Sequence, residues 1–173
     1  MSIFDHREQW LADFQAGWLK TYLDTGELDW KVYNLPKNET TVSGPAVDLS
    51  KSRLAVITTG GFYVAGKQEP MDEPDMHGRY DIRLLPADMP PEEFSIVHGH
   101  YDHTAANEDR QVLLPMRHLA EMVEAGEIGE IAPNIISFMG YQPDVTRVLD
   151  ETIPAIVTAA QEMEVTAALL LPA

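Results

Sequence analysis

The segment RLAVITTGG, residues 53–61, combines a short apolar run with an abrupt turn. The four consecutive apolar residues 54–57 predict a strand that is buried on both faces, as in a parallel sheet. Thr58 and Thr59 offer hydroxyl groups, and Gly60 and Gly61 allow a tight turn with close backbone approach to a ligand. We therefore expect a buried strand that ends in a candidate binding turn.

Similar apolar runs follow along the chain. Three of them predict further strands, and a fourth predicts an edge strand: 94–97, 134–139, 165–171 and 82–85. Helical patterns over 115–125 and 143–164 separate the later strands, and Pro154 should kink or divide the second helix. This alternation predicts an α/β fold with a mostly parallel sheet and helices on both faces, in three layers.

The first 52 residues have a different character. Residues 5–23 predict an amphipathic helix that stops at Gly26, and residues 28–52 are polar and broken by proline and glycine. We therefore expect an N-terminal helix with an extended arm over 1–52 and an α/β domain over 53–173. The arm and the domain are expected to form a single globular unit.

The composition limits the classes of partner. The chain has 12 Lys+Arg against 28 Asp+Glu, a formal net charge of -16, and no cysteine. This balance argues against nucleic acid and against an anionic membrane surface as partners. No apolar run is long enough to span a bilayer, and the first residues lack the form of a signal peptide. We expect a cytoplasmic protein without disulfides or thiolate metal sites.

Candidate chemistry follows three of the predicted strands. Three of the apolar runs end in residues 58–61, 98–103 and 137–140, and the fourth run ends in Pro172 and Ala173. Ligands of parallel α/β sheets bind beyond the carboxyl ends of the strands. These segments are therefore expected to share one pocket.

The run His98-Gly99-His100-Tyr101-Asp102-His103 allows more than one kind of site. His98, His100, Asp102 and His103 resemble the H-x-H-x-D-H signature of metallo-β-lactamase-like hydrolases, which implies a divalent metal such as zinc, manganese or iron. The chain departs from that pattern, because the only later histidine is His118. Alternatively, the histidines carry protons or form a polar network without a metal.

Several blocks taken in order resemble the selenoprotein B family of glycine, sarcosine, betaine and D-proline reductases. The blocks are residues 54–61, 98–102, 112–115, 119–129, 132–133, 137–140 and 168–172. The resemblance implies reductive cleavage of a carbon–nitrogen bond, with a selenocysteine or cysteine nucleophile and partner proteins that carry electrons or the substrate adduct. It also implies that the reactive residue follows the strand that matches residues 166–172.

This chain has no cysteine, and Ala173 stands where that nucleophile is expected. We therefore expect that the nucleophile is lacking because a selenocysteine codon was read as a stop, or that the chain is a short paralogue without reductase chemistry. The nucleotide sequence after codon 173 separates the two. A last strand without a covering helix would leave part of the sheet open, which predicts a homo-oligomer.

The positions of the candidate residues at the ends of the predicted strands suggest their roles. Thr58, Thr59, Gly60 and Gly61 would contact the carboxylate or backbone of a small amino-acid-like or other nitrogen-containing substrate. His98, His100 and Asp102 would act as acid–base and orienting groups, while Ser137 and Met139 would line the pocket. A redox protein is the expected partner for an oxidoreductase of this type. The alternatives are the metal-dependent hydrolase and a non-catalytic binding subunit.

Overall fold

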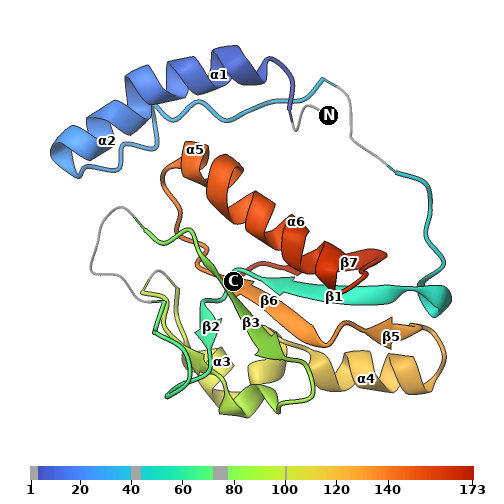
Figure 1. The fold of residues 1–173 in the computed structure, drawn as a ribbon. Helices are drawn as coiled ribbons and strands as arrows, with labels where there is room; N and C mark the ends of the chain where they lie inside the picture. The colour runs from blue at the N-terminus through green and yellow to red at the C-terminus, as the bar shows by residue number, and fades with distance from the viewer. Residues whose placement is uncertain (1–3, 40–43, 72–77, 100) are drawn as a thin grey trace. The chain divides into compact units, whose positions relative to one another are not determined.

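The computed structural model describes residues 4–39, 44–71, 78–99 and 101–173 (Figure 1). The chain divides into two compact units, Met1–Ala46 and Val47–Ala173. The expectation of one globular unit that includes the arm stays a prediction. Among the described residues, no helix has both the length and the apolar character that a membrane span requires.

The N-terminal unit is built on one interrupted helix. Helix α1 (Arg7–Phe14) continues through a π-helical turn (Gln15–Leu19) into α2 (Lys20–Thr25). The helix stops at Gly26, whose φ of 73° is left-handed, as the sequence predicts. The segment that follows runs back without regular structure along the same unit.

Aromatic rings hold this unit together. Trp10, Phe14, Trp18 and Tyr22 follow one another at four-residue spacing, and successive ring centroids lie 5.1, 5.8 and 5.4 Å apart. The indole N–H groups of Trp10 and Trp18 donate to backbone carbonyls of the returning segment at 2.6 and 3.0 Å. The side of the helix that carries these aromatic rings is therefore its packed side. The two indole hydrogen bonds hold the returning segment against it.

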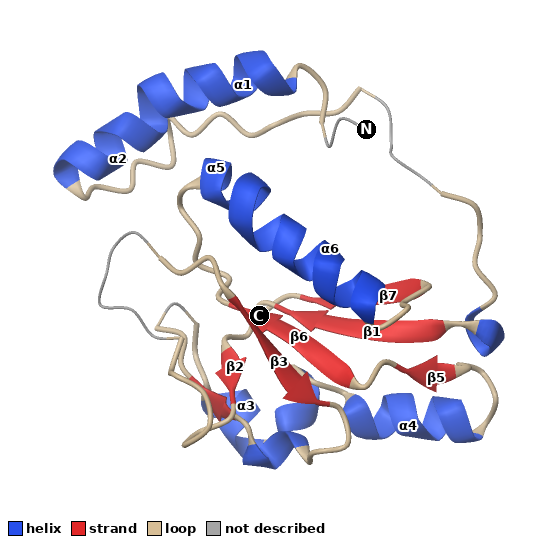
Figure 2. Cartoon of the chain, in the orientation of Figure 1, coloured by secondary structure: helices blue, strands red, loops and turns tan. Residues whose placement is uncertain are grey.

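The second unit is an α/β domain with a mostly parallel sheet (Figures 1 and 2). Its central strand β1 (Arg53–Thr58) is parallel to β5 (Glu130–Ile131), β6 (Asn134–Phe138) and β7 (Ala167–Leu171). Strands β5 and β6 lie along one edge of β1, and β7 lies along the other. The same residues of β1 pair with β5 or β6 and with β7, which requires neighbours on both edges. The predicted edge strand is β3 (Ile82–Pro86), which runs antiparallel to β6.

The two faces of β1 are covered by different helices. Leu54 and Val56 belong to a core cluster with Met116 and Leu119 of α4 (Met116–Glu124). Ala55, the next residue, belongs to a second cluster with α6 (Ile153–Glu162). Alternate side chains of a strand point to opposite faces, which explains why this strand is an unbroken apolar run.

The predicted helix over 143–164 is divided, as Pro154 indicates. It consists of α5 (Val145–Arg147), a π-helical turn (Val148–Thr152) and α6, which carries Pro154 in its first turn. The residues before Pro154 are also helical, and proline has no N–H to donate to the preceding turn, so the regular α-helical ladder is interrupted at this point.

The predicted strand over 94–97 is wrong in its extent and in its sheet. Only Ser95–Ile96 forms a strand, β4, and it pairs antiparallel with β2 (Phe62–Tyr63) in a separate small sheet. β2 directly follows the diglycine turn, and β4 pairs with β2. The remaining helical pieces are α3 (Thr104–Glu108) and three short 3₁₀ turns, Leu49–Lys51, Pro91–Glu93 and Arg110–Val112.

Candidate functional site

The carboxyl ends of three parallel strands meet at Thr59. Its N–H donates to the carbonyl of Leu171, the last residue of β7, at 3.2 Å, and its own carbonyl accepts from the N–H of Gly140 after β6 at 3.0 Å. A third hydrogen bond of this residue is made by its hydroxyl, which accepts from the N–H of Ala173 at 2.9 Å. Segments more than 100 residues apart in the chain are thus tied together at one edge of the sheet.

The diglycine turn closes this edge. Gly60 N–H donates to the Thr58 hydroxyl at 3.1 Å, and Gly61 N–H donates to the Phe138 carbonyl at 3.2 Å. Both glycine amides are therefore engaged within the chain and are not free donors for a ligand. Gly61 has a φ of 66°, and a Cβ atom there would lie 2.8 Å from the Val97 carbonyl oxygen.

His98 lies close to the diglycine turn. Its neighbour Val97 donates its N–H to the Gly61 carbonyl at 3.3 Å. A Cβ atom at Gly140 would come within 3.1 Å of His98 Nε2, so the imidazole lies directly beside the chain that leaves β6. His98 is 6% exposed. The fold thus brings His98 to the edge where Thr59 and the glycines are located.

Tyr101, which the sequence did not mark as a site residue, connects the histidine run to the turn. Its hydroxyl donates to the Gly60 carbonyl at 3.1 Å. Its ring centroid lies 4.9 Å from that of His98 and 4.5 Å from that of His103. Burial raises the pKa of Tyr101, so its hydroxyl stays a donor at neutral pH. Its position between the histidines was the only sequence signal.

Asp102 and His103 use their polar atoms within the loop. The Asp102 carboxylate accepts from the side chain and the N–H of Thr104 at 2.7 and 2.9 Å, and these bonds lower the pKa of Asp102. His103 Nε2 lies 2.7 Å from the His98 carbonyl oxygen, which assigns the proton to that nitrogen. Asp102 is exposed. Its evident role is to start α3.

The metal-site alternative gains no support from this geometry. Two of its four proposed ligands, Asp102 and His103, have side-chain atoms that are engaged elsewhere. A third, His100, lies outside the described residues. Within the part of the chain that the structure describes, no group of three or more His, Cys, Asp or Glu side chains is arranged to hold a metal ion.

Ser137 and Met139 lie on β6 and directly after it. Ser137 pairs with Thr58 across the parallel strands and is fully buried. Its hydroxyl is the one buried side-chain oxygen or nitrogen of the described residues that lacks a hydrogen-bond partner. Met139 is also buried, and it forms an isolated bridge with Gly60.

A second polar cluster fixes the loop after Gly140. The Tyr80 hydroxyl accepts from Asp144 N–H at 2.8 Å, and Gln142 donates to the Thr152 hydroxyl at 2.9 Å. The Arg147 guanidinium lies 4.0 Å from the centre of the Tyr80 ring. Burial raises the pKa of Tyr80 to about 12. These contacts hold the exit of β6 in place.

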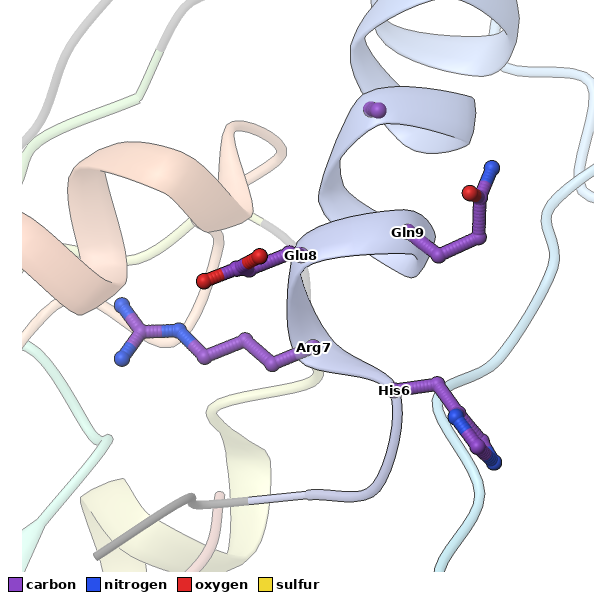
Figure 3. A pocket seen from close by; sticks show the side chains of 5 residues that line it. His6, Arg7, Glu8 and Gln9 are labelled. Atoms are coloured by element: carbon purple, nitrogen blue, oxygen red, sulfur yellow. The ribbon is translucent and has the colours of Figure 1, made fainter.

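None of the predicted site residues lines the open hollow at the start of α1 (Figure 3). It is lined by His6, Arg7, Glu8, Gln9 and Ala12. Arg7 and Glu8 project to one side of the helix, whereas His6 and Gln9 project to the other. Because these polar side chains diverge, they form no convergent group that would define a chemistry.

Comparison with known proteins identifies relatives among reductase subunits. The glycine reductase complex component B subunit gamma of Peptoclostridium acidaminophilum is 31% identical over 102 residues, which are 57% of this chain and 23% of that protein. The D-proline reductase subunit gamma of Acetoanaerobium sticklandii is 27% identical over 123 residues, 71% of this chain and 49% of that protein. The betaine reductase complex component B subunit beta of Peptoclostridium acidaminophilum is 30% identical over 115 residues, 61% of this chain and 25% of that protein.

The chain spans less than half the length of each of these relatives. No solved structure gives a significant match. The family model described as glycine/sarcosine/betaine reductase selenoprotein B matches residues 26–171, which include the strands, the diglycine turn and the histidine run. The chain therefore belongs to the glycine/sarcosine/betaine reductase selenoprotein B family.

Proposed function

We propose that this chain takes part in reductive cleavage of a carbon–nitrogen bond in a small amino-acid-like or other nitrogen-containing substrate. The observation that carries the proposal is the 2.9 Å hydrogen bond from Ala173 N–H to the Thr59 hydroxyl. It supports a site in which the segment after β7, where the family resemblance expects the reactive residue, lies beside the diglycine turn and His98.

The roles of the side chains follow from which donors remain. Because the amides of Gly60 and Gly61 are engaged, the hydroxyls of Thr58 and Ser137 are the proposed donors to the substrate carboxylate. His98 is the proposed acid that protonates the leaving amine, because a neutral amine leaves more easily than its anion. His100 is proposed to assist His98.

Two other candidates have supporting roles. Asp102 is proposed to orient the histidine run through its bonds to Thr104 rather than to move protons. Met139 is proposed to line the apolar side of the substrate.

The nucleophile of this reaction is proposed to come from outside these 173 residues. The chain has no cysteine, and the reaction that the family resemblance implies needs a thiolate or selenolate that is ionised near neutral pH. The curated relatives are named as subunits of reductase complexes. A redox protein that delivers a thiol or selenol and the electrons is therefore the proposed partner.

Calorimetric titration with glycine, sarcosine, betaine and D-proline tests the substrate class. We expect at least one of them to bind the wild-type chain and to bind Ser137→Ala more weakly, with Ser95→Ala, on the separate small sheet, as the matched control. We also expect no amine release when the isolated chain is given substrate and dithiothreitol. Binding of none of the four, or equal binding by Ser137→Ala, would contradict the proposal.

We also propose that a second copy of the chain covers β7. Among the described residues this strand pairs only with β1, and Leu170 is 69% exposed on it. An unpaired apolar edge is a site at which another chain adds. Sedimentation at micromolar concentration is expected to give a dimer or larger species that Leu170→Lys disrupts, and a monomeric wild-type chain would refute this.

A further inference from the structure

Two arginines at the start of β3 share one carboxylate. The Arg79 guanidinium donates to Asp81 at 3.0 and 3.2 Å, and the Arg83 guanidinium donates to the same side chain. The three side chains together carry one net positive charge, in a chain whose formal net charge is -16. The Arg83 side chain is only 13% exposed. Because a buried cation is costly unless an anion compensates it, this excess charge favours an anionic ligand.

The arginine pair lies at the same edge of the sheet as the candidate site. Strand β3 is antiparallel to β6, so β3 begins where β6 ends. The segment before β3 runs beside the segment after β6, because the Gln142 amide donates to the Arg79 carbonyl at 2.8 Å. Arg83 donates to Asp81, which precedes β3, so its guanidinium lies toward the carboxyl end of β6.

Arg83 also shares a face of the sheet with the two hydroxyls that we propose as donors to the substrate carboxylate. Ser137 pairs with Arg83 across β3 and β6, and with Thr58 across β6 and β1. Side chains directly opposite each other in an antiparallel pair lie on one face, with Cβ atoms roughly 4.5–5.5 Å apart. Ser137, in the middle of this row, is fully buried and carries the hydroxyl that lacks a partner among the described residues. The row therefore consists of one cation and two hydroxyls.

The hydrogen bonds within the chain do not use the whole Arg83 guanidinium. A guanidinium has five N–H groups. Four of them donate to the Asp81 carboxylate, to the Ile82 carbonyl and, in two long bonds of 3.3 and 3.4 Å, to the Glu69 carbonyl. Within the described part of the chain, the remaining N–H group has no acceptor. A ligand beside Ser137 can therefore accept from Arg83 while the bond to Asp81 is kept.

We propose that Arg83 is a specificity-determining residue, which binds the carboxylate of the substrate together with the hydroxyls of Thr58 and Ser137. The inference rests on the proposed function, because it assumes that the substrate binds at this edge. A carboxylate balances the excess charge of the arginine pair and accepts a stronger hydrogen bond from a guanidinium than a neutral group does. A carboxamide of the same shape has neither advantage, so the site selects carboxylates over carboxamides.

Acetate and acetamide test this contact, because they have nearly the same shape and differ in charge. Each is added at constant ionic strength to the isotope-labelled full chain, and the side-chain Nε–H signals of the arginines are followed by NMR. Arg83→Lys identifies the Arg83 signal and keeps the charge, but it removes the planar fork of donors. Arg117→Lys, at an exposed position of α4, is the matched control.

We expect the Arg83 signal to shift and saturate with acetate and to stay unchanged with acetamide. Arg83→Lys should weaken acetate binding about tenfold or more, read from the backbone signals of Thr58 and Ser137, whereas Arg117→Lys should leave it unchanged. An Arg83 signal of the wild-type chain that shifts no more with acetate than the Arg117 signal would overturn the inference, and this result needs no variant to fold.

The same experiment separates this inference from the proposed function, because acetate has no amine to release. Equal binding of glycine, sarcosine, betaine or D-proline by the wild-type chain and by Arg83→Lys would refute the role of Arg83 and leave the proposed function standing. Saturable acetate binding at Arg83, with none of these four compounds bound, would refute the proposed function and leave the carboxylate contact standing.

Discussion

The substitution Gly61→Ala tests whether the diglycine turn holds the loop that carries His98. Gly61 has a φ of 66°, and a Cβ atom there would lie 2.8 Å from the Val97 carbonyl oxygen and 3.3 Å from His98 Cβ. The left-handed conformation alone costs a residue with a Cβ atom roughly 1–2 kcal/mol. Overpacking against the fixed backbone adds about 1–3 kcal/mol, so we expect the unfolding free energy to fall by about 3 kcal/mol.

Gly66→Ala is the matched control. Gly66 has a φ of 76°, but no heavy atom lies within 4 Å of the Cβ position. This substitution therefore carries the conformational cost of roughly 1–2 kcal/mol without the contact. The difference between the two variants isolates the contact between the turn and the strand that leads to His98.

Urea unfolding followed by far-UV circular dichroism measures both free energies. Tryptophan fluorescence is unsuitable, because all three tryptophans, Trp10, Trp18 and Trp30, lie in the N-terminal unit. If Gly61→Ala costs no more than Gly66→Ala, the turn does not hold the histidine run, and the shared site loses its basis.

Three further substitutions test individual side chains. Ser137→Ala removes a buried hydroxyl without a partner, so the unfolding free energy in urea is expected to stay equal or rise by about 1 kcal/mol, and a clear loss would show a missed partner. Tyr80 has a pKa raised to about 12 from 10.0, so the stability that its protonated form provides is complete below pH 10 and is lost as the pH rises to 12. Tyr80→Phe should flatten that alkaline loss in thermal melts, and an unchanged pH profile would contradict it. The pKa of Asp102 is lowered in the folded chain, so the stabilisation of α3 by its carboxylate is present above pH 3.8 and is lost as the pH falls through the folded-state pKa. Asp102→Ala should speed amide exchange at Thr104, whereas Asp102→Asn should not.

Much of the α/β unit could be predicted because its signals are local. The apolar run 54–57, the proline before α4 and the glycine after it each mark an element within a few residues. The strand that pairs with Ser95–Ile96 could not be predicted, because a strand of two residues carries no sequence pattern that identifies its partner. The break between β5 and β6 likewise depends on Pro133, which has no N–H for the ladder.

The meeting of the strand ends was predictable, whereas the hydrogen bonding at that edge was not. The rule that ligands meet the carboxyl ends of parallel strands correctly brings the ends of β1, β6 and β7 together at Thr59. The sequence could not show that the amides of Gly60 and Gly61 are already engaged. The same limit applies to Tyr101, whose contact with Gly60 depends on the path of a loop.

The π-helical turn before α6 has a consequence for how the chain tolerates changes in length. A residue inserted or deleted in a helix rotates everything beyond it by about 100° around the axis. Val148–Thr152 is different, because a π-helical hydrogen bond spans one residue more than an α-helical one. Deleting one residue there would let the segment form a regular α-helical turn, with Ala159 and Met163 still packed against Ala55. A deletion within α6 itself would turn these residues away from the sheet.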